Sequence, residues 1–207
     1  MAVIDLRPLP VTRDPARRLP QLLVGLALYG TSMALQIRGT LGLNPWDVLH
    51  EGLAAQTPLS FGVVTAVTGA AVLLLWIPLR QRPGVGTVAN VVVIAVSVDV
   101  ALALIPEPSE LWARVAMLVG GIVLNGVATA AYVGARLGPG PRDGLMTGLA
   151  ARTGWSIRLV RTGIEIVVLG AGWLLGGTVG VGTLGYALAI GPLTQAFLPF
   201  LVVRDRQ

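Results

Sequence analysis

Six long apolar runs alternate with short polar segments along the chain. A run of about 20 apolar residues is long enough to cross the hydrocarbon core of a bilayer as a helix. The third run is interrupted by Asp99, and the fifth carries Arg158, Arg161 and Glu165 in its first half. The pattern predicts an all-α polytopic membrane protein. Its six expected transmembrane helices span residues 19–37, 61–79, 85–106, 115–135, 157–175 and 183–203.

Two shorter segments, residues 45–57 and 141–153, follow the first and the fourth run. Both are too short and too polar to cross a membrane alone. Each begins with a proline, which favours the first helical position, and has an aspartate in its first turn, Asp47 or Asp143. We therefore expect a short re-entrant or interfacial helix in each segment, with Asn44 and Gly140 as the N-caps.

The two short segments belong to a repeat with a constant offset of 96 residues. Residues 42–57 read GLNPWDVLHEGLAAQT, and residues 138–153 read GPGPRDGLMTGLAART. Residues 30–87 align with residues 126–183 without a gap. Identical residues occur along this alignment, which ends in a shared GVGT. Each copy holds three spans, so the second must enter the membrane from the opposite side. The sequence thus predicts a 3+3 inverted repeat, with residues 19–106 and 112–203 as its halves.

The charges orient this arrangement. Only 12% of the residues are charged, and the net charge of +5 comes from arginines near the ends of the runs. Cytoplasmic loops of membrane proteins are rich in Lys and Arg. This rule places the polar leader (1–18) and the tail (204–207) in the cytoplasm. The same distribution argues against nucleic-acid binding. The arginines on the expected cytoplasmic side are Arg7, Arg13, Arg17, Arg18, Arg80, Arg82, Arg136, Arg142, Arg152, Arg158, Arg204 and Arg206.

Cysteine and histidine usage limits the chemistry. The chain has no cysteine and one histidine, His50, so neither a thiol nucleophile nor a Cys/His metal site is expected. The sequence shows neither a nucleophile paired with a general base nor a phosphate-binding motif. We expect no enzyme activity, no metal and no cofactor.

Ionisable residues at membrane depth are costly and are therefore candidates for a functional site. Asp47 and Asp143 are either plain helix caps or members of a site shared by both repeats. Arg161 can pair with Glu165 one turn away or reach Asp143, and Asn90 can line a cavity or join helices. His50 is either a proton relay beside Asp47 or interfacial surface, and tryptophans such as Trp76 suit belt anchoring. The candidate substrate-binding residues are Asn44, Asp47, Asp143, Arg142, Asp99, Gln195, Asn90, Arg161 and Glu165.

Three functions fit these features. The first is a small secondary transporter or channel-like permease with a central site between the two short helices. Its substrate is an unidentified small molecule or ion. The second is a membrane accessory or scaffold protein that supports a partner enzyme or exporter. The third, an enzyme acting on lipid-linked substrates, has the least support. A homodimer in the lipid bilayer is compatible with the small size of the chain.

Several segments together resemble the YczE-like group of bacterial membrane proteins, which is related to the YyaS and YitT proteins. They are NPWDVLHEGL, RPGVGT, GPRDGLM, RTGWS, GVGT and IGP. The resemblance covers nearly the whole chain except the leader. It implies a bacterial inner-membrane protein of a largely uncharacterised family, and it supplies no substrate or catalytic residues.

Overall fold

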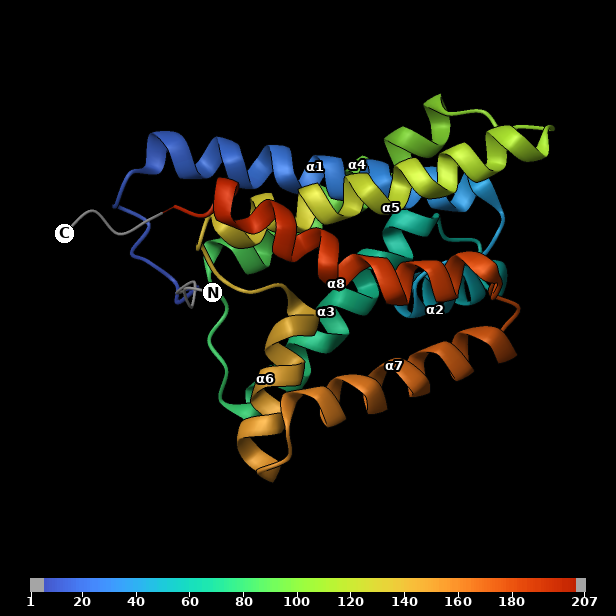
Figure 1. Cartoon of the computed structure of the whole chain (residues 1–207). Coiled ribbons are helices and arrows are strands. Elements are labelled where there is room, and N and C mark those ends of the chain that lie inside the picture. Colours follow the sequence, from blue (N-terminus) through green and yellow to red (C-terminus); the bar gives the residue numbers. More distant parts are fainter. Residues whose placement is uncertain (1–5, 204–207) are drawn as a thin grey trace.

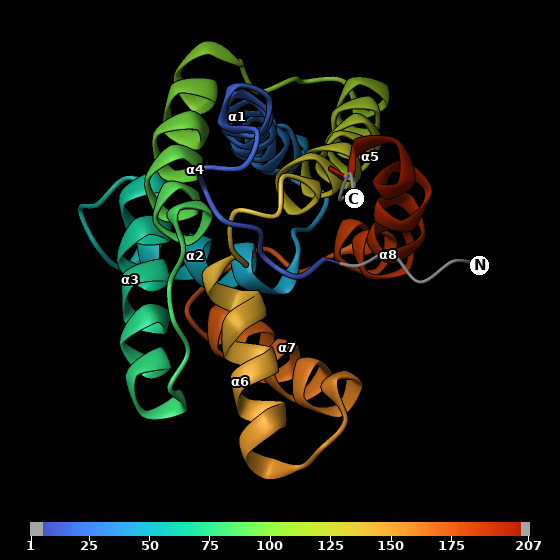
Figure 2. The same ribbon diagram turned by 90° about the vertical axis from the view of Figure 1, so that its left-hand side faces the viewer.

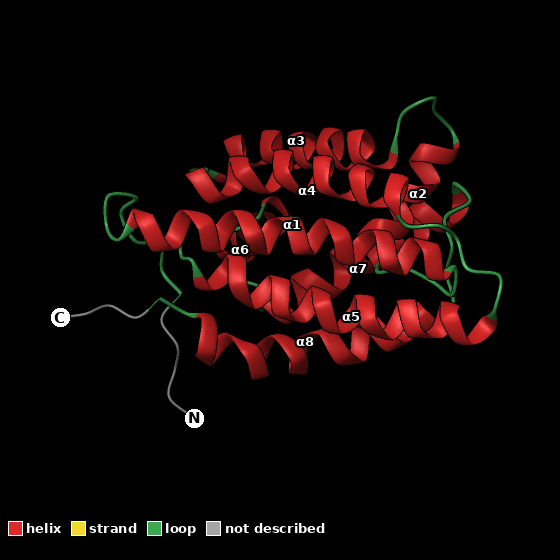
Figure 3. Ribbon diagram, turned by 90° about the horizontal axis from the view of Figure 1, so that it is seen from above, coloured by secondary structure: helices red, strands yellow, loops and turns green. Residues whose placement is uncertain are grey.

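The computed structural model describes residues 6–203, and within them the chain forms eight α-helices and no strand (Figures 1 and 3). The all-α prediction is confirmed. The expected tail, residues 204–207, lies outside the described residues. The helices are α1 (Pro15–Gly39), α2 (Pro45–Ala55), α3 (Phe61–Leu79), α4 (Val85–Leu104), α5 (Leu111–Gly134), α6 (Pro141–Thr153), α7 (Ile157–Leu174) and α8 (Val181–Leu201).

Four helices within the described residues, α3, α4, α5 and α8, are long and apolar enough to cross a membrane. Large apolar side chains on their outer faces are exposed, as expected for surfaces in contact with lipid. Examples are Leu74, Leu104 and Leu188. The other two long helices, α1 and α7, carry arginines and are not among these four candidate spans. Helix α1 begins at Pro15, inside the segment expected to be a polar leader.

Each of the first four helices has a counterpart that begins 96 residues later. The starting pairs are Pro15 and Leu111, Pro45 and Pro141, Phe61 and Ile157, and Val85 and Val181. The two short helices are among them, so both are present where the sequence places them.

Helices α1 and α5 pack against each other and run antiparallel (Figure 1). They approach closely because small residues lie at their crossing. A Cβ atom on Gly25 would meet the backbone nitrogen of Tyr132 at 2.9 Å, and one on Gly121 would meet the carbonyl oxygen of Ser32 at 3.0 Å. Helix α4 packs on α1, and α8 packs on α5. The main apolar core lies where α1, α4 and α5 meet.

The remaining helices pack across the two halves of the chain. Helix α2 packs on α7, and α6 packs on α3. The two contacts differ in shape. A Cβ atom on Gly144 in α6 would lie 2.0 Å from the ring of Trp76 in α3, whereas Gly172 in α7 lets the backbone of Val48 approach. Trp76 is therefore buried and donates its indole N–H to the carbonyl of Pro141, so its expected role as a belt residue is wrong.

The two halves also differ in how their last two helices pack. Helix α3 packs along α4, whereas α7 and α8 diverge from the turn that joins them and do not pack as a pair (Figures 1 and 2). Gly62 of α3 allows the first contact, because a Cβ there would meet the carbonyl oxygen of Ala95 at 2.2 Å. The corresponding residue of α7 is Arg158, whose side chain cannot fit such an approach.

Candidate functional site

The starts of the two short helices meet at one cavity of about 320 Å³. Residues from α1, α3, α4, α5, α7 and α8 complete its wall. Several lining positions come in pairs 96 residues apart, and the partners differ in chemistry. Such pairs are Trp46 and Arg142, His50 and Met146, Thr65 and Arg161, and Asn90 and Tyr186. The cavity is thus built from equivalent positions of the two copies but is chemically asymmetric.

The start of α2 is held by reciprocal capping. The Asn44 side chain accepts a hydrogen bond from the backbone N–H of Asp47 at 3.1 Å and donates its amide to Asp47 Oδ2. These bonds satisfy a backbone donor of the first turn. Both side chains are buried. Asp47 Oδ2 therefore has a structural role as part of the cap.

The second oxygen of Asp47 is not used by the cap. Oδ1 is buried and accepts no hydrogen bond from residues 6–203. It lies 3.4 Å from His50 Nδ1 and 3.7 Å from Arg142 Nη2. His50 is also buried, 3.3 Å from the hydroxyl of Thr65 in α3. Arg142 belongs to α6, so Oδ1 is the point where the polar groups of the two short helices come together.

Arg142 lies over the ring of Trp46, with 5.0 Å between its guanidinium carbon and the ring centroid. Its guanidinium also approaches Asp47, but across residues 6–203 it donates no hydrogen bond. The side chain is 24% exposed. Trp46 is buried in the cavity wall, and its indole N–H has no acceptor in the described part of the chain.

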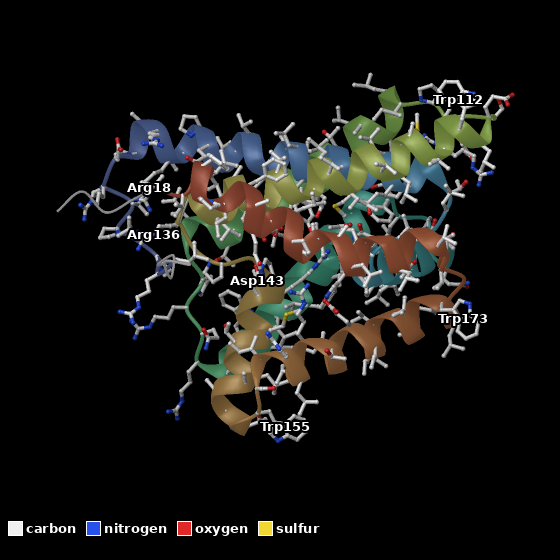
Figure 4. The ribbon with its side chains drawn as sticks, in the orientation of Figure 1. Arg18, Trp112, Arg136, Asp143, Trp155 and Trp173 are labelled. Carbon is white, nitrogen blue, oxygen red and sulfur yellow. The ribbon has the colours of Figure 1, made fainter. Side chains whose placement is uncertain are left out.

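Asp143 occupies the position in α6 that Asp47 occupies in α2, near the middle of the molecule (Figure 4). Its N-cap, Gly140, has no side chain to offer. Instead Oδ2 accepts a hydrogen bond from the Tyr132 hydroxyl of α5 at 3.3 Å. The two equivalent aspartates are therefore held differently.

Arg161 and Glu165 form an ion pair at 2.8 Å on the cavity side of α7. Of the two partners expected for Arg161, the structure selects Glu165. Asn90 of α4 and Gln195 of α8 also line the cavity, and neither makes a hydrogen bond within the described part of the chain.

Asp99 does not line the cavity. Its carboxylate accepts hydrogen bonds from the hydroxyl of Ser60 and from the backbone N–H of Gly62, the latter at 2.7 Å. It therefore fastens the start of α3 to α4, and the expectation that it converges with the other candidates is not met. Its counterpart Gln195 does line the cavity, because α8 is not covered by α7.

Three tyrosines that sequence reasoning did not select also line the cavity: Tyr29, Tyr132 and Tyr186. The hydroxyl of Tyr186 donates to Asn125, and Tyr29 packs edge-on against Tyr132. The offset of 96 residues could have predicted one of these three tyrosines as a lining residue. Tyr186 is the counterpart of Asn90, which was selected.

A second missed pair is Arg18 and Arg114, which are also 96 residues apart. Arg18 is buried and donates to the carbonyls of Ala135 and Arg136 at the end of α5 (Figure 4). Arg114 donates to the carbonyls of Gly39 and Thr40 at the end of α1. Each first helix of a repeat thus caps the other, as cations near helix C-termini do.

The described residues contain no group of three or more His, Cys, Asp or Glu side chains arranged to hold a metal ion. The site is a polar, partly charged cavity between helices, and its lining includes groups that can form hydrogen bonds and ion pairs.

Comparison with known proteins places the chain among membrane proteins whose roles are not established. Residues 16–199 match the profile described as "Family of unknown function (DUF6198)". The chain belongs to this family. The match spans both copies of the sequence repeat.

Individual relatives agree with the family match. An "Uncharacterized protein" of Haemophilus influenzae is 41% identical over 86% of this chain and 81% of its own length. The "Uncharacterized membrane protein YczE" of Bacillus subtilis is 34% identical over 84% and 82%. The "Uncharacterized protein YyaS" of the same organism is 24% identical over 86% and 90%. The resemblance to YczE and YyaS is confirmed. No solved structure gives a significant match.

Proposed function

We propose that the protein is a small secondary transporter and that the central cavity is its substrate site. The observation that carries the proposal is the approach of Arg142 to Asp47 at the cavity, since it joins the starts of α2 and α6. Irregular backbone at membrane depth is tolerated where it lines a cavity or is buried in protein. Sites between broken or short helices at a repeat interface are typical of secondary transporters.

The proposal includes the topology. Helices α1, α3, α4, α5, α7 and α8 are the six spans of a 3+3 inverted repeat, and α2 and α6 enter from opposite faces. The antiparallel α1 and α5 and the reciprocal caps of Arg18 and Arg114 support it. Two equivalent backbone hydrogen bonds also support it. The N–H of Gly86 donates to the carbonyl of Leu137, and the N–H of its counterpart Gly182 donates to the carbonyl of Leu41, the counterpart of Leu137. Both termini are cytoplasmic, and the protein lies in the bacterial inner membrane.

The different packing of the two halves supplies a route to the cavity. Asp99, Ser60 and Gly62 hold α3 against α4 on the proposed external side. On the other side α7 and α8 are apart, and the Arg161–Glu165 pair lies beside the cavity. We infer that this conformation is open to the cytoplasm. Transport then requires α7 to close on α8 while α3 leaves α4, which exchanges the conformations of the two repeats.

The first test is a metabolite comparison between cells with and without the protein, followed by flux of the changed solutes into proteoliposomes. Thr194→Trp places a large ring in the cavity wall and should abolish flux. Thr162→Trp is the matched control on the exposed face of α7 and should preserve it. Flux that is absent from the native protein would contradict the proposal and favour the accessory role. Flux that survives Thr194→Trp would exclude this cavity as the route.

A further inference from the structure

Three donors at the cavity lack an acceptor among the described residues. Arg142 donates no hydrogen bond within residues 6–203, the indole N–H of Trp46 is buried without a partner, and the amide of Asn90 is also unbonded. A buried donor without an acceptor costs about 1–3 kcal/mol. This cost applies to the buried Trp46 N–H, and the partly exposed Arg142 and Asn90 add two further free donors on the same wall. Together they indicate a ligand that supplies oxygen acceptors.

The setting of Arg142 suits an oxyanion. Stacking on the Trp46 ring uses the face of the guanidinium and keeps the N–H edge available for bidentate contacts. Asp47 Oδ1, at 3.7 Å, is beyond the 2.7–2.9 Å typical of a charge-assisted hydrogen bond. A ligand carboxylate that approaches Arg142 to hydrogen-bonding distance makes stronger contacts than Asp47 does. It can therefore replace Asp47 at Arg142.

The charge around the cavity limits the ligand to a single negative charge. Arg161 is neutralised by Glu165 at 2.8 Å, which leaves Arg142 as the cation for a ligand among the described lining residues. Asp143 also lines the cavity, and Asp47 lies beside it. A second negative charge on the ligand would face these two carboxylates at low effective dielectric, where repulsion is strong.

On the basis of the proposed transport function, we propose that the substrate is a small organic monocarboxylate. Its carboxylate is held by Arg142, with the Trp46 and Asn90 N–H groups as further donors. The volume of about 320 Å³ is at the lower end of the range for small-molecule sites. The hydroxyl of Tyr29 and the side chains of Thr65 and Thr129 provide the rest of a polar wall.

The test measures binding to the purified full-length protein in nanodiscs by calorimetry. The probes are propionate and benzoate, their uncharged analogues propionamide and benzamide, and inorganic phosphate. We expect the two carboxylates to bind and the amides not to bind. Arg142→Gln should weaken carboxylate binding at least tenfold and Arg142→Lys less, whereas Arg82→Gln, in an exposed loop, should leave it unchanged. Trp46→Phe keeps the ring, removes the N–H and should weaken binding several-fold.

Other outcomes would overturn the inference. They are equal binding of amides and carboxylates, tighter binding of phosphate, no binding of either carboxylate, and binding that Arg142→Gln leaves unchanged. If Arg142→Gln does not fold, Arg142→Lys and Trp46→Phe decide. Flux measurements separate this inference from the proposed function. Carboxylate binding without flux contradicts transport alone, and flux of any solute that survives Arg142→Gln contradicts the carboxylate site alone.

Discussion

Arg142 Nη2 and Asp47 Oδ1 lie 3.7 Å apart, although the two residues come from different copies of one repeated segment. The same oxygen lies 3.4 Å from His50 Nδ1 and accepts no hydrogen bond within the residues that the structure describes. Asp47 Oδ2, by contrast, is committed to the cap with Asn44. One carboxylate thus holds the start of α2 with one oxygen and faces the other short helix with the second.

This division of roles predicts the effect of Asp47→Asn. An asparagine retains an oxygen for the amide of Asn44, so the cap remains, but its negative charge no longer competes for Arg142. We expect propionate to bind several-fold more tightly than to the native protein. Asp143→Asn, whose carboxylate bonds to Tyr132 instead, should change the affinity less. Calorimetry measures both, and weaker propionate binding by Asp47→Asn would contradict the exchange at Arg142.

Arg18 should contribute more to stability than its counterpart Arg114. Its guanidinium is buried and donates to five carbonyls, two of them at the end of α5. Arg18→Ala removes all five hydrogen bonds, although the carbonyls of Pro10 and Arg136 keep a backbone donor. We expect a loss of about 3–5 kcal/mol. Arg114→Ala should cost less because that side chain is only partly buried. Thermal unfolding in detergent ranks the variants, with the exposed Arg82→Ala as control. Equal effects of all three would argue against the cap.

Gly144 tests the packing of α6 on α3. A methyl group there would lie 2.0 Å from the Trp76 ring, which is fixed by burial and by its bond to Pro141. Gly144→Ala should cost about 3 kcal/mol or more. Gly170→Ala in α7 has no atom within 4 Å of its Cβ and should be neutral or stabilise the helix by up to about 1 kcal/mol. Adding Trp76→Leu should recover part of the Gly144→Ala loss. No recovery would show that the clash lies elsewhere.

Asp99 tests the closed contact between α3 and α4. Asp99→Ala removes the acceptor for Ser60 and Gly62, so α3 should leave α4 more often. Because the chain has no cysteine, Thr68→Cys on the cavity wall reports exposure directly. We expect faster labelling of Thr68→Cys by an impermeant maleimide from outside when Asp99→Ala is present. Gln195→Ala, at the equivalent position, should have no such effect. An unchanged rate with Asp99→Ala would exclude this contact as a gate.

The helices could be predicted from sequence more fully than the site could. The apolar runs and the Pro-Asp starts located α2, α3 and α6 closely, because span length and capping are local properties. Contacts between distant helices are not local. Trp76 resembles an interfacial residue until Gly144 is placed against it, and Asp99 resembles a cavity residue until Gly62 brings α3 to its side.

Arg18 shows where the sequence held more information. At the edge of an apolar run, it reads as an ordinary positive charge on the cytoplasmic side. Its match with Arg114 at the same offset of 96 indicates a shared structural role, which the caps on α5 and α1 explain. The cavity is lined by both α7 and α8, which do not pack as a pair, and no local pattern indicates that packing.

The central claim, that the two repeats enter the membrane from opposite sides, is tested most directly by a matched pair of cysteines. Thr57 and Thr153 are exposed, end the two short helical segments and each bond to the carbonyl four residues earlier. An impermeant maleimide is added to intact cells and to inverted vesicles that contain Thr57→Cys or Thr153→Cys. We predict labelling of Thr57→Cys only from outside and of Thr153→Cys only from the cytoplasmic side. Labelling of both from the same side would contradict the inverted repeat and the transport mechanism built on it.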